Sequence, residues 1–163
     1  MKKVLLLSVL VISLIGCVGY IAYANQPKPP QLPKQHIFTP EELLAEANKL
    51  RAEKGVAPLK LDPRLNQSAQ WKADDMMASG NFTHVNNGYH GYQKAEELMP
   101  ECYWLSENIA GTDIDKSPFD IDGWPSSPKH YAAEINPDYD YTGFGVIQKG
   151  TSNTYVQHFC GMK

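Results

Sequence analysis

The sequence lacks an excess of positive charge. Its 163 residues carry 15 lysines and arginines against 18 aspartates and glutamates, which gives a formal charge of −3 at pH 7. A nucleic-acid-binding surface needs a cluster of basic side chains to neutralise phosphates. The composition therefore argues against a nucleic-acid partner. The sequence also has no internal repeat of the kind that builds a solenoid.

Common hydrolase signatures are missing as well. The chain has no H-E-x-x-H motif, which would place two zinc ligands and a general base on one helix. Neither Cys102 nor Cys160 lies in a nucleophile motif. Ser127 lies near His130, but it directly precedes Pro128 and is expected to cap a helix with its side-chain oxygen. These absences argue against a protease.

The N-terminus has the form of an export signal. Two lysines precede an uncharged, mostly apolar run over residues 4–24. We favour cleavage after the A-x-A site at residues 22–24, so that the mature chain begins at Asn25. One alternative is retention as a membrane anchor, because the run would be about 30 Å long as a helix. The other is lipid attachment at Cys17. Each outcome places the rest of the chain outside the cytoplasm, either secreted or held at the membrane by its N-terminal segment.

Composition divides the chain into three regions. Residues 1–24 are the signal peptide or N-terminal membrane anchor. Residues 25–38 hold four prolines and little apolar content, which is typical of a linker with polyproline II character. Residues 39–163 are long enough for one domain of ordinary size. The 42% of apolar residues in the chain is typical of a globular protein.

Two cysteines remain for this domain once Cys17 is assigned to the leader. Outside the cytoplasm, cysteines tend to form disulfides, so we predict a bond between Cys102 and Cys160. Closing a loop of that length contributes roughly 4 kcal/mol in the chain-entropy model. The alternative is a pair of buried free thiols.

Helix signals dominate the first half of the domain. Thr39, Pro40 and Glu42 form a capping-box pattern ahead of apolar residues at helical spacing. This pattern predicts a helix that ends at Gly55. A second helix is predicted over residues 63–79, between an Asp-Pro start and a glycine. Both helices are expected to be core scaffold.

Shorter elements follow. We predict an extended connector over residues 58–61, a short helix over 92–98 and a strand over 103–110. A second short helix is predicted over residues 128–135, and a final hairpin is predicted from strands over 139–148 and 154–160. This order predicts an α+β fold in which helices cover both faces of a small, mainly antiparallel sheet.

Three groups of residues carry a likeness to a known family. The first is the helix pair that runs into His84. The second is S-E-N-I-A at residues 106–110, similar to the pattern G-E-N-I/L-A. The third is Trp124 with residues 127–137, similar to W-x-x-S-P-G-H-R-x-x-I/L-x-N-P. Together, over residues 39–161, they resemble the CAP superfamily, or SCP domain, of cysteine-rich secretory proteins, antigen 5 and pathogenesis-related protein 1. Its short bacterial members are the most similar.

The resemblance implies a three-layer α-β-α sandwich with a cleft that carries two histidines and two glutamates. By motif position, His84 and His130 are the histidines and Glu107 is the first glutamate. The second glutamate of longer members falls on Ser127. The expected tetrad is therefore incomplete.

Two neutral imidazoles in one cleft suit Zn²⁺ or another divalent cation. We expect His84 and His130 to be the metal ligands, and binding to be weak because the protein supplies just two. Glu107 would either be a further ligand of the cation or accept a hydrogen bond from the N–H of a ligand histidine and so orient that ring. Alternatively, both histidines satisfy a buried Glu107 and the cluster is structural. Glu134, four residues after His130, is expected to be exposed, or as a hypothesis to replace the missing carboxylate in part. His158 is expected to be a satisfied residue of the sheet.

We expect a non-catalytic binding or interaction domain. Aromatic residues fall in the segments around the proposed cleft, at positions 89, 92, 103, 104, 124 and 131. Aromatic-lined grooves take lipids, sterols, peptides or glycans. The alternative is a metal-dependent hydrolase or protease that uses the same cleft, although such an enzyme needs a third protein ligand and a general base.

Overall fold

The computed structural model describes residues 36–162. The predicted signal or anchor over residues 1–24, and most of the predicted linker over residues 25–38, lie outside the described residues. Within residues 36–162, no helix combines the length and the apolar character that a membrane crossing requires.

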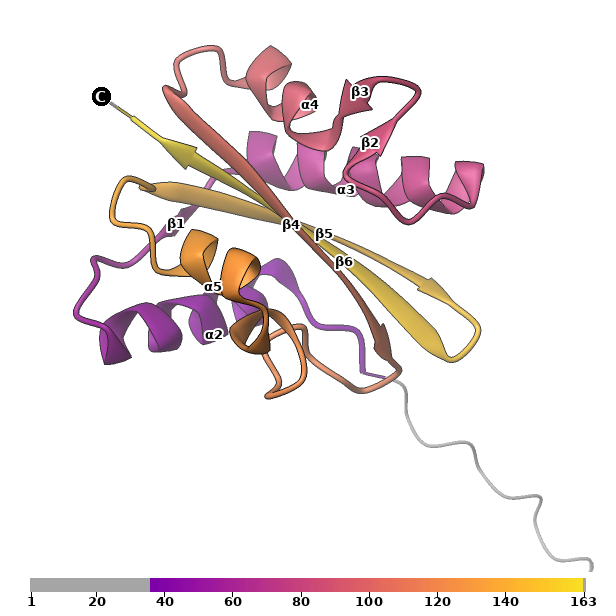
Figure 1. Cartoon of the computed structure of the whole chain (residues 1–163), viewed down its shortest axis with the longest axis horizontal. Coiled ribbons are helices and arrows are strands. Elements are labelled where there is room, and N and C mark those ends of the chain that lie inside the picture. The colour runs from indigo at the N-terminus through magenta and orange to yellow at the C-terminus, as the bar shows by residue number, and fades with distance from the viewer. Residues whose placement is uncertain (1–35, 163) are drawn as a thin grey trace, which may run out of the picture. The chain divides into compact units, whose positions relative to one another are not determined.

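A four-stranded sheet forms the central layer of the described domain (Figure 1). The strand order is β1, β5, β6, β4. Strands β5 and β4 each pair antiparallel with β6, and β1 runs parallel to β5. The strands are β1 (Lys60–Leu61), β4 (Trp104–Asp113), β5 (Tyr141–Lys149) and β6 (Ser152–Gly161). Strand β4 therefore forms one outer edge of the sheet.

Helices cover both faces of this sheet (Figure 1). Helices α3 and α4 pack on one face, and α2, α5 and the short 3-10 helix η1 lie on the other. A small hairpin, β2 and β3, leads from α3 to α4. The bounds are α2 (Pro40–Glu53), α3 (Pro63–Ser79), β2 (Val85–Asn86), β3 (Tyr89–His90), α4 (Gly91–Leu98), η1 (Trp124–Ser126) and α5 (Pro128–Glu134). The predicted three-layer α-β-α sandwich with a small, mainly antiparallel sheet is confirmed.

The local signals for the two long helices act as predicted. The Thr39 hydroxyl accepts a hydrogen bond from the N–H of Glu42 at 3.2 Å, and the Glu42 carboxylate accepts one from the N–H of Thr39 at 2.8 Å. Asp62 caps α3, which ends at Gly80 with a left-handed φ of 71°. These contacts satisfy backbone groups that a helix terminus leaves unpaired.

Helix α3 packs directly on the backbone of β5. A Cβ atom on Gly145 would collide with the α3 backbone, so this approach requires glycine. The N–H of Phe144 donates to the side-chain oxygen of Asn66 in α3, at 2.9 Å. The N–H of Val146 donates to Gln70 in the same way, at 3.0 Å. The helix therefore also covers the part of the β5 edge that β1 does not reach.

The strand boundaries differ from the predictions at several points, and two differences change the sheet. The segment expected to be a connector contributes Lys60 and Leu61 to the sheet as β1, parallel to β5. Strand β4 continues to Asp113 instead of ending at Ala110, because its pairing with β6 extends to Ser152. Pairing with a neighbouring strand determines strand length more strongly than the local sequence does.

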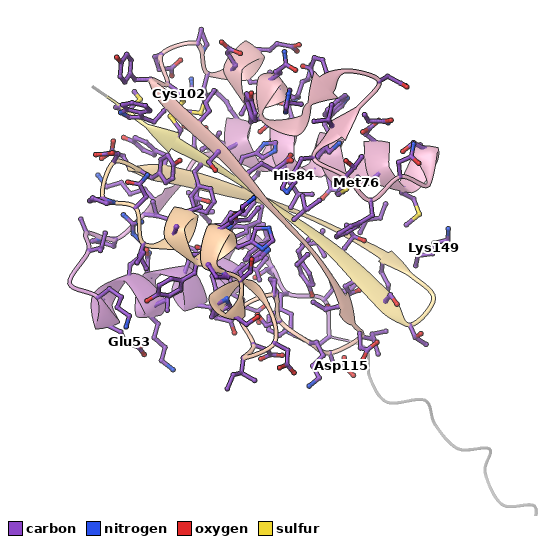
Figure 2. The ribbon with its side chains drawn as sticks, viewed as in Figure 1. Glu53, Met76, His84, Cys102, Asp115 and Lys149 are labelled. Carbon is purple, nitrogen blue, oxygen red and sulfur yellow. A yellow bond between two sulfur atoms is a disulfide. The ribbon has the colours of Figure 1, made fainter. Side chains whose placement is uncertain are left out.

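Cys102 and Cys160 form the predicted disulfide, with their Cα atoms 5.5 Å apart. Figure 2 shows this bond near the start of β4. It joins the segment before β4 to the end of β6 across 58 residues of sequence. The bond therefore fixes the end of the sheet opposite the β5–β6 turn.

The contact between α3 and β5 gives a test of the packing. Gly145→Ala is expected to lower the free energy of unfolding by about 2–3 kcal/mol, because the added methyl group collides with backbone that cannot move aside. Gly111→Ala, in β4, is the matched control: its Cβ would lie 3.7 Å from the Phe82 ring, an ordinary contact. Urea unfolding of both variants measures the difference. Equal stability of the two variants would contradict the packing described here.

Candidate functional site

Glu107 lies buried in the middle of β4 and binds two histidines. Its carboxylate oxygens lie 2.8 Å from Nδ1 of His84 and 2.9 Å from Nε2 of His158. His158 is its cross-strand neighbour in β6, whereas His84 precedes β2 and lies beside β4 (Figure 2). The Glu107 side chain is 3% exposed. The two histidines supply the partners that a buried carboxylate needs.

These contacts fix the tautomers of both rings. A carboxylate only accepts hydrogen bonds, so His84 carries a proton on Nδ1 and His158 carries one on Nε2. On its other side, Nδ1 of His158 lies 2.7 Å from the hydroxyl oxygen of Ser68 in α3, and the Ser68 O–H donates to the carbonyl of Leu65 at 3.0 Å. Nε2 of His84 keeps a free lone pair on a side chain that is 48% exposed. A chain of hydrogen bonds therefore runs from the core to a solvent-facing imidazole.

Asn108, the next residue in β4, holds the opposite layer. Its side-chain N–H donates to the backbone carbonyl of His130 at 3.2 Å and to the carboxylate of Glu134 at 2.8 Å. Both acceptors belong to α5. Successive residues of a strand point to opposite faces. Glu107 therefore positions His84 on one side of β4, and Asn108 positions the helix of His130 on the other.

The rings of His84 and His130 approach each other at this edge of the sheet. Their centroids are 6.2 Å apart with an interplanar angle of 47°. Burial and the nearby His84 lower the pKa of His130 below its ordinary value, which keeps the ring neutral near pH 7. For Glu107, burial alone would raise the pKa, but the hydrogen bonds from His158 and His84 outweigh it and lower the pKa. The site therefore combines a carboxylate whose ionised form is favoured with an imidazole, that of His130, whose neutral form is favoured.

The start of α4 also shapes the site. A Cβ atom on Gly91 would collide with the carboxylate of Glu107, so glycine lets the helix start approach that group. The N–H of Gly91 donates to the carbonyl of His84 at 3.0 Å. This bond fixes the backbone that carries the exposed imidazole.

The structure thus brings His84, Glu107 and His130 together, as the sequence predicts. It differs in one contact: the second histidine bound to Glu107 is His158. The expectation of a satisfied sheet residue for His158 is correct, but its importance to the site was missed, as was that of Ser68. The register that pairs Glu107 with His158 was the missing signal, and it depends on strand pairing.

Glu134 is not the exposed residue expected from the sequence. It is fully buried beneath α5, where it accepts hydrogen bonds from Asn108 and, at 3.4 Å, from Gln157. Burial raises the pKa of Glu134 to about 8, although these bonds and the charge of Arg51 favour the ionised form. Burial therefore favours the neutral form of Glu134.

Ser127 occupies the predicted N-cap of α5, ahead of Pro128. Its side chain makes no capping hydrogen bond, so the expectation that a cap occupies its hydroxyl is wrong. The backbone carbonyl of Ser127 accepts the N–H of Tyr131 at 2.8 Å and starts the helix. Proline at the first helical position already fixes the backbone there.

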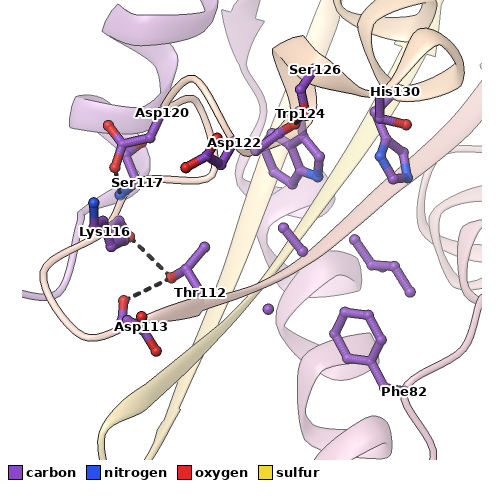
Figure 3. A pocket seen from close by; sticks show the side chains of 15 residues that line it. Phe82, Thr112, Asp113, Lys116, Ser117, Asp120, Asp122, Trp124, Ser126 and His130 are labelled. Atoms are coloured by element: carbon purple, nitrogen blue, oxygen red, sulfur yellow. Dashed lines mark hydrogen bonds between the residues drawn. The ribbon is translucent and has the colours of Figure 1, made fainter.

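A groove of about 430 Å³ lies beside β4 and ends at His130 (Figure 3). Residues 109–113 form its floor, the 116–127 segment and Trp124 form one wall, and Phe82 lies on the other side. His84 and Glu107 do not line it. Of the six aromatic residues expected around the cleft, Trp124 alone lines this groove. The aromatic lining of this groove is therefore Trp124 and Phe82, and the other five aromatic residues expected around the cleft do not line it.

The described residues include no group of three or more His, Cys, Asp or Glu side chains arranged to hold a metal ion. His84 and His130 offer two imidazole donors at the edge of β4. Their ability to bind a cation stays a prediction.

An α-β-α sandwich with a carboxylate between histidines defines the class of this domain. The model of the CAP family, the cysteine-rich secretory protein family, matches residues 44–159. The chain therefore belongs to the CAP family.

Several proteins are similar to this chain. It is 28% identical over 120 residues to YlbC, an uncharacterised membrane protein of Bacillus subtilis strain 168. The matched region covers 73% of this chain and 34% of YlbC. An outer surface protein of Borrelia burgdorferi superposes with a TM-score of 0.68 at 24% identity, over 79% of this chain and 99% of that one. An extracellular SCP-domain protein of Bacillus anthracis strain Ames gives 0.65 at 20% identity, over 75% and 40%. The two superpositions show the fold, and the chain spans about a third of the length of YlbC.

The buried Glu134 predicts a pH dependence of stability. Its folded pKa of about 8 lies above the ordinary value of 4.5, so between these values the folded state holds a proton that the unfolded state has released. Stability from this group is present below pH 4.5 and falls as pH rises to about 8, by at most about 5 kcal/mol. Glu134→Gln keeps the shape without the titration. We expect the variant to become more stable than wild type as pH rises from 5 to 8.

Urea unfolding between pH 5 and pH 9 measures this difference. Glu53→Gln, at an exposed position of α2, is the control and should follow the wild-type profile. Parallel profiles for wild type and Glu134→Gln would show that Glu134 is ionised in the folded protein.

Proposed function

We propose that this CAP domain is a non-catalytic binding module that works outside the cytoplasm and binds Zn²⁺ or a similar divalent cation weakly through His84 and His130. The observation that carries the proposal is the 2.8 Å hydrogen bond between Glu107 and Nδ1 of His84. This bond leaves the exposed Nε2 as an unprotonated donor. A carboxylate behind a metal-binding imidazole is the usual way in which proteins orient such a ligand.

The separation of the two rings fits a shared cation. Two imidazoles that bind one ion through Zn–N bonds of about 2.1 Å have ring centroids roughly 5–6 Å apart. The ring centroids of His84 and His130 are 6.2 Å apart, which is slightly more than this range. The lowered pKa of His130 also keeps its lone pair available near pH 7.

Two protein ligands make a weak and exchangeable site. The position where longer members of the family have a second glutamate is Ser127, which lines the groove beside His130. Water would complete the coordination shell on this open side. The cation would then serve as a contact point for a further ligand such as a lipid, sterol, peptide or glycan.

The alternative of a metal-dependent hydrolase receives less support from the geometry. A hydrolase needs a carboxylate or another base that can take a proton from water. Both oxygens of Glu107 are held by histidines, and the side chain is 3% exposed. Ser68 lies beside His158 but is fully buried, so no substrate reaches its hydroxyl. Binding without turnover is the function that these contacts favour.

A location outside the cytoplasm has independent support. The similar proteins from Borrelia burgdorferi and Bacillus anthracis are described as an outer surface protein and an extracellular protein. The disulfide between Cys102 and Cys160 is stable in an oxidising compartment. The basic and apolar start of the sequence is suited to export.

Calorimetric titration of metal-free protein with Zn²⁺ tests the site. We expect one weak site in the wild type and its loss in both His84→Ala and His130→Ala. Glu107→Gln should bind about tenfold more weakly or worse, because the amide cannot accept both histidine N–H groups. His90→Ala, outside the site, should bind as wild type does.

Thermal unfolding of each variant separates loss of binding from loss of fold. Unchanged Zn²⁺ affinity in folded His84→Ala would refute the proposed ligands. A structural cluster would instead show lower stability in these variants and no Zn²⁺ binding in any protein, wild type included.

Mass spectrometry of the native N-terminus tests the export signal. We expect a mature chain that begins at Asn25, because the A-x-A site precedes it. An intact N-terminus in the membrane fraction would show retention as an anchor, and a lipid-modified Cys17 would show a lipoprotein. An intact chain in the cytoplasm would contradict the proposed location.

A further inference from the structure

We infer that the open edge of β4 receives an extended peptide segment with basic side chains, which adds to the sheet as a further strand within the groove. The inference rests on the proposed function in treating the domain as a binding module. It does not require the cation.

The backbone register shows which groups are available. The N–H of Ile114 donates to the carbonyl of Thr151 in line with the β4–β6 register. In an antiparallel pair, alternate residues direct both backbone groups toward the partner strand, and the residues between them direct theirs away. Ile109 and Gly111 therefore point their N–H and C=O groups away from β6, into the groove. Within residues 36–162, none of these four groups has a hydrogen-bond partner.

On the other side of the sheet, the outward edge of β5 is covered. Strand β1 covers the start of β5, and side chains of α3 bind the next outward N–H groups, those of Phe144 and Val146. Proteins commonly cover edge strands because free backbone groups bind other chains. Among the described residues, no such cover is provided for the outward backbone groups of Ile109 and Gly111 at the floor of the groove.

The groove has the dimensions of an added strand. Its floor, residues 109–113, spans roughly 13 Å at about 3.3 Å per residue. Phe82 lies on one side of β4, and Trp124 and His130 lie on the other (Figure 3). Because Gly111 has no side chain, no atoms project from the floor of the groove beside the Phe82 ring at this position. Side chains of a bound peptide would alternate between these two sides.

Charge indicates the kind of peptide. Asp113, Asp120 and Asp122 line the groove, with Lys116 as the single basic residue. The net negative charge of the walls favours a segment that carries lysine or arginine.

The chain's own N-terminal segment is a poor candidate for this position. The described chain begins close by, since the N–H of His36 donates to Asp115 at 2.6 Å. However, residues 27–33 contain four prolines, which lack the N–H that strand addition uses. A separate peptide segment without this proline density is therefore the better occupant.

The first experiment uses the full-length ¹⁵N-labelled protein in EDTA. The probes are hexapeptides with blocked termini, in which lysine or arginine alternates with one apolar residue, and each apolar residue is tested in turn. In the control peptides, glutamate replaces the basic residue. We expect the basic probes to shift the amide signals of Ile109 and Gly111 and to slow their hydrogen exchange. An added strand directs the N–H groups of every second residue toward β4. N-methylation of either the odd-numbered or the even-numbered peptide residues should therefore abolish binding, whereas N-methylation of the other set should not.

A second experiment changes the edge itself. Gly111→Pro removes an outward N–H without removing a bond to β6, which an edge strand tolerates. We expect at least about a tenfold loss of peptide affinity, whereas Gly111→Ala should lose less than about threefold. Asp113→Asn with Asp122→Asn should weaken the basic probes about two- to tenfold at low salt. Asp138→Asn, at an exposed position outside the groove, should not.

Several results would overturn the inference. These are no protection at Ile109 or Gly111 with any probe, equal effects of N-methylation in both sets of peptide residues, or equal binding of glutamate probes. Self-association that Gly111→Pro abolishes would make a second copy of the chain the occupant instead. Because EDTA removes the cation, failure of the Zn²⁺ site and failure of the peptide site are observed separately.

Discussion

Two neighbouring residues of one edge strand hold the site together. Glu107 and Asn108 point to opposite faces of β4, and each binds a different layer of the sandwich. The carboxylate holds His84 and His158 on the side of α3 and α4, while the amide holds the helix of His130 on the other side. The histidine pair exists because the alternation of a strand places these two polar groups back to back.

The pKa values of two buried glutamates near this strand shift in opposite directions, and their partners explain why. Glu107 has two histidine N–H donors, which stabilise its ionised form against the cost of burial. Glu134 has amide donors, and burial dominates, so its pKa rises to about 8. Glu107 lies behind the exposed imidazole of His84, where a carboxylate would strengthen the proposed metal ligand. Glu134 lies in α5, where it contributes to packing against the sheet.

The same edge strand connects the two proposed activities. At its middle, the histidines meet where the layers of the sandwich come together. Further along, its backbone is open to the groove between Phe82 and Trp124. A peptide on this edge would extend toward His130, so a cation there could contact the same ligand. His130 belongs to both the histidine pair and the lining of the groove, so the two proposed sites share this residue.

The sequence by itself determined the class of fold, the helix starts, the disulfide and the three residues at the centre of the site. Capping boxes and the positions of proline and glycine are local signals, and local physics is sufficient for them. The S-E-N-I-A and S-P-x-H patterns indicated the site residues through their resemblance to the family. The tertiary structure alone decided that His158 and Ser68 stand behind Glu107, that Glu134 is buried, and that the edge of β4 is open. Each of these depends on which strand pairs with which and on what covers each face. These contacts join residues that are far apart in the sequence, so no local sequence pattern predicts them.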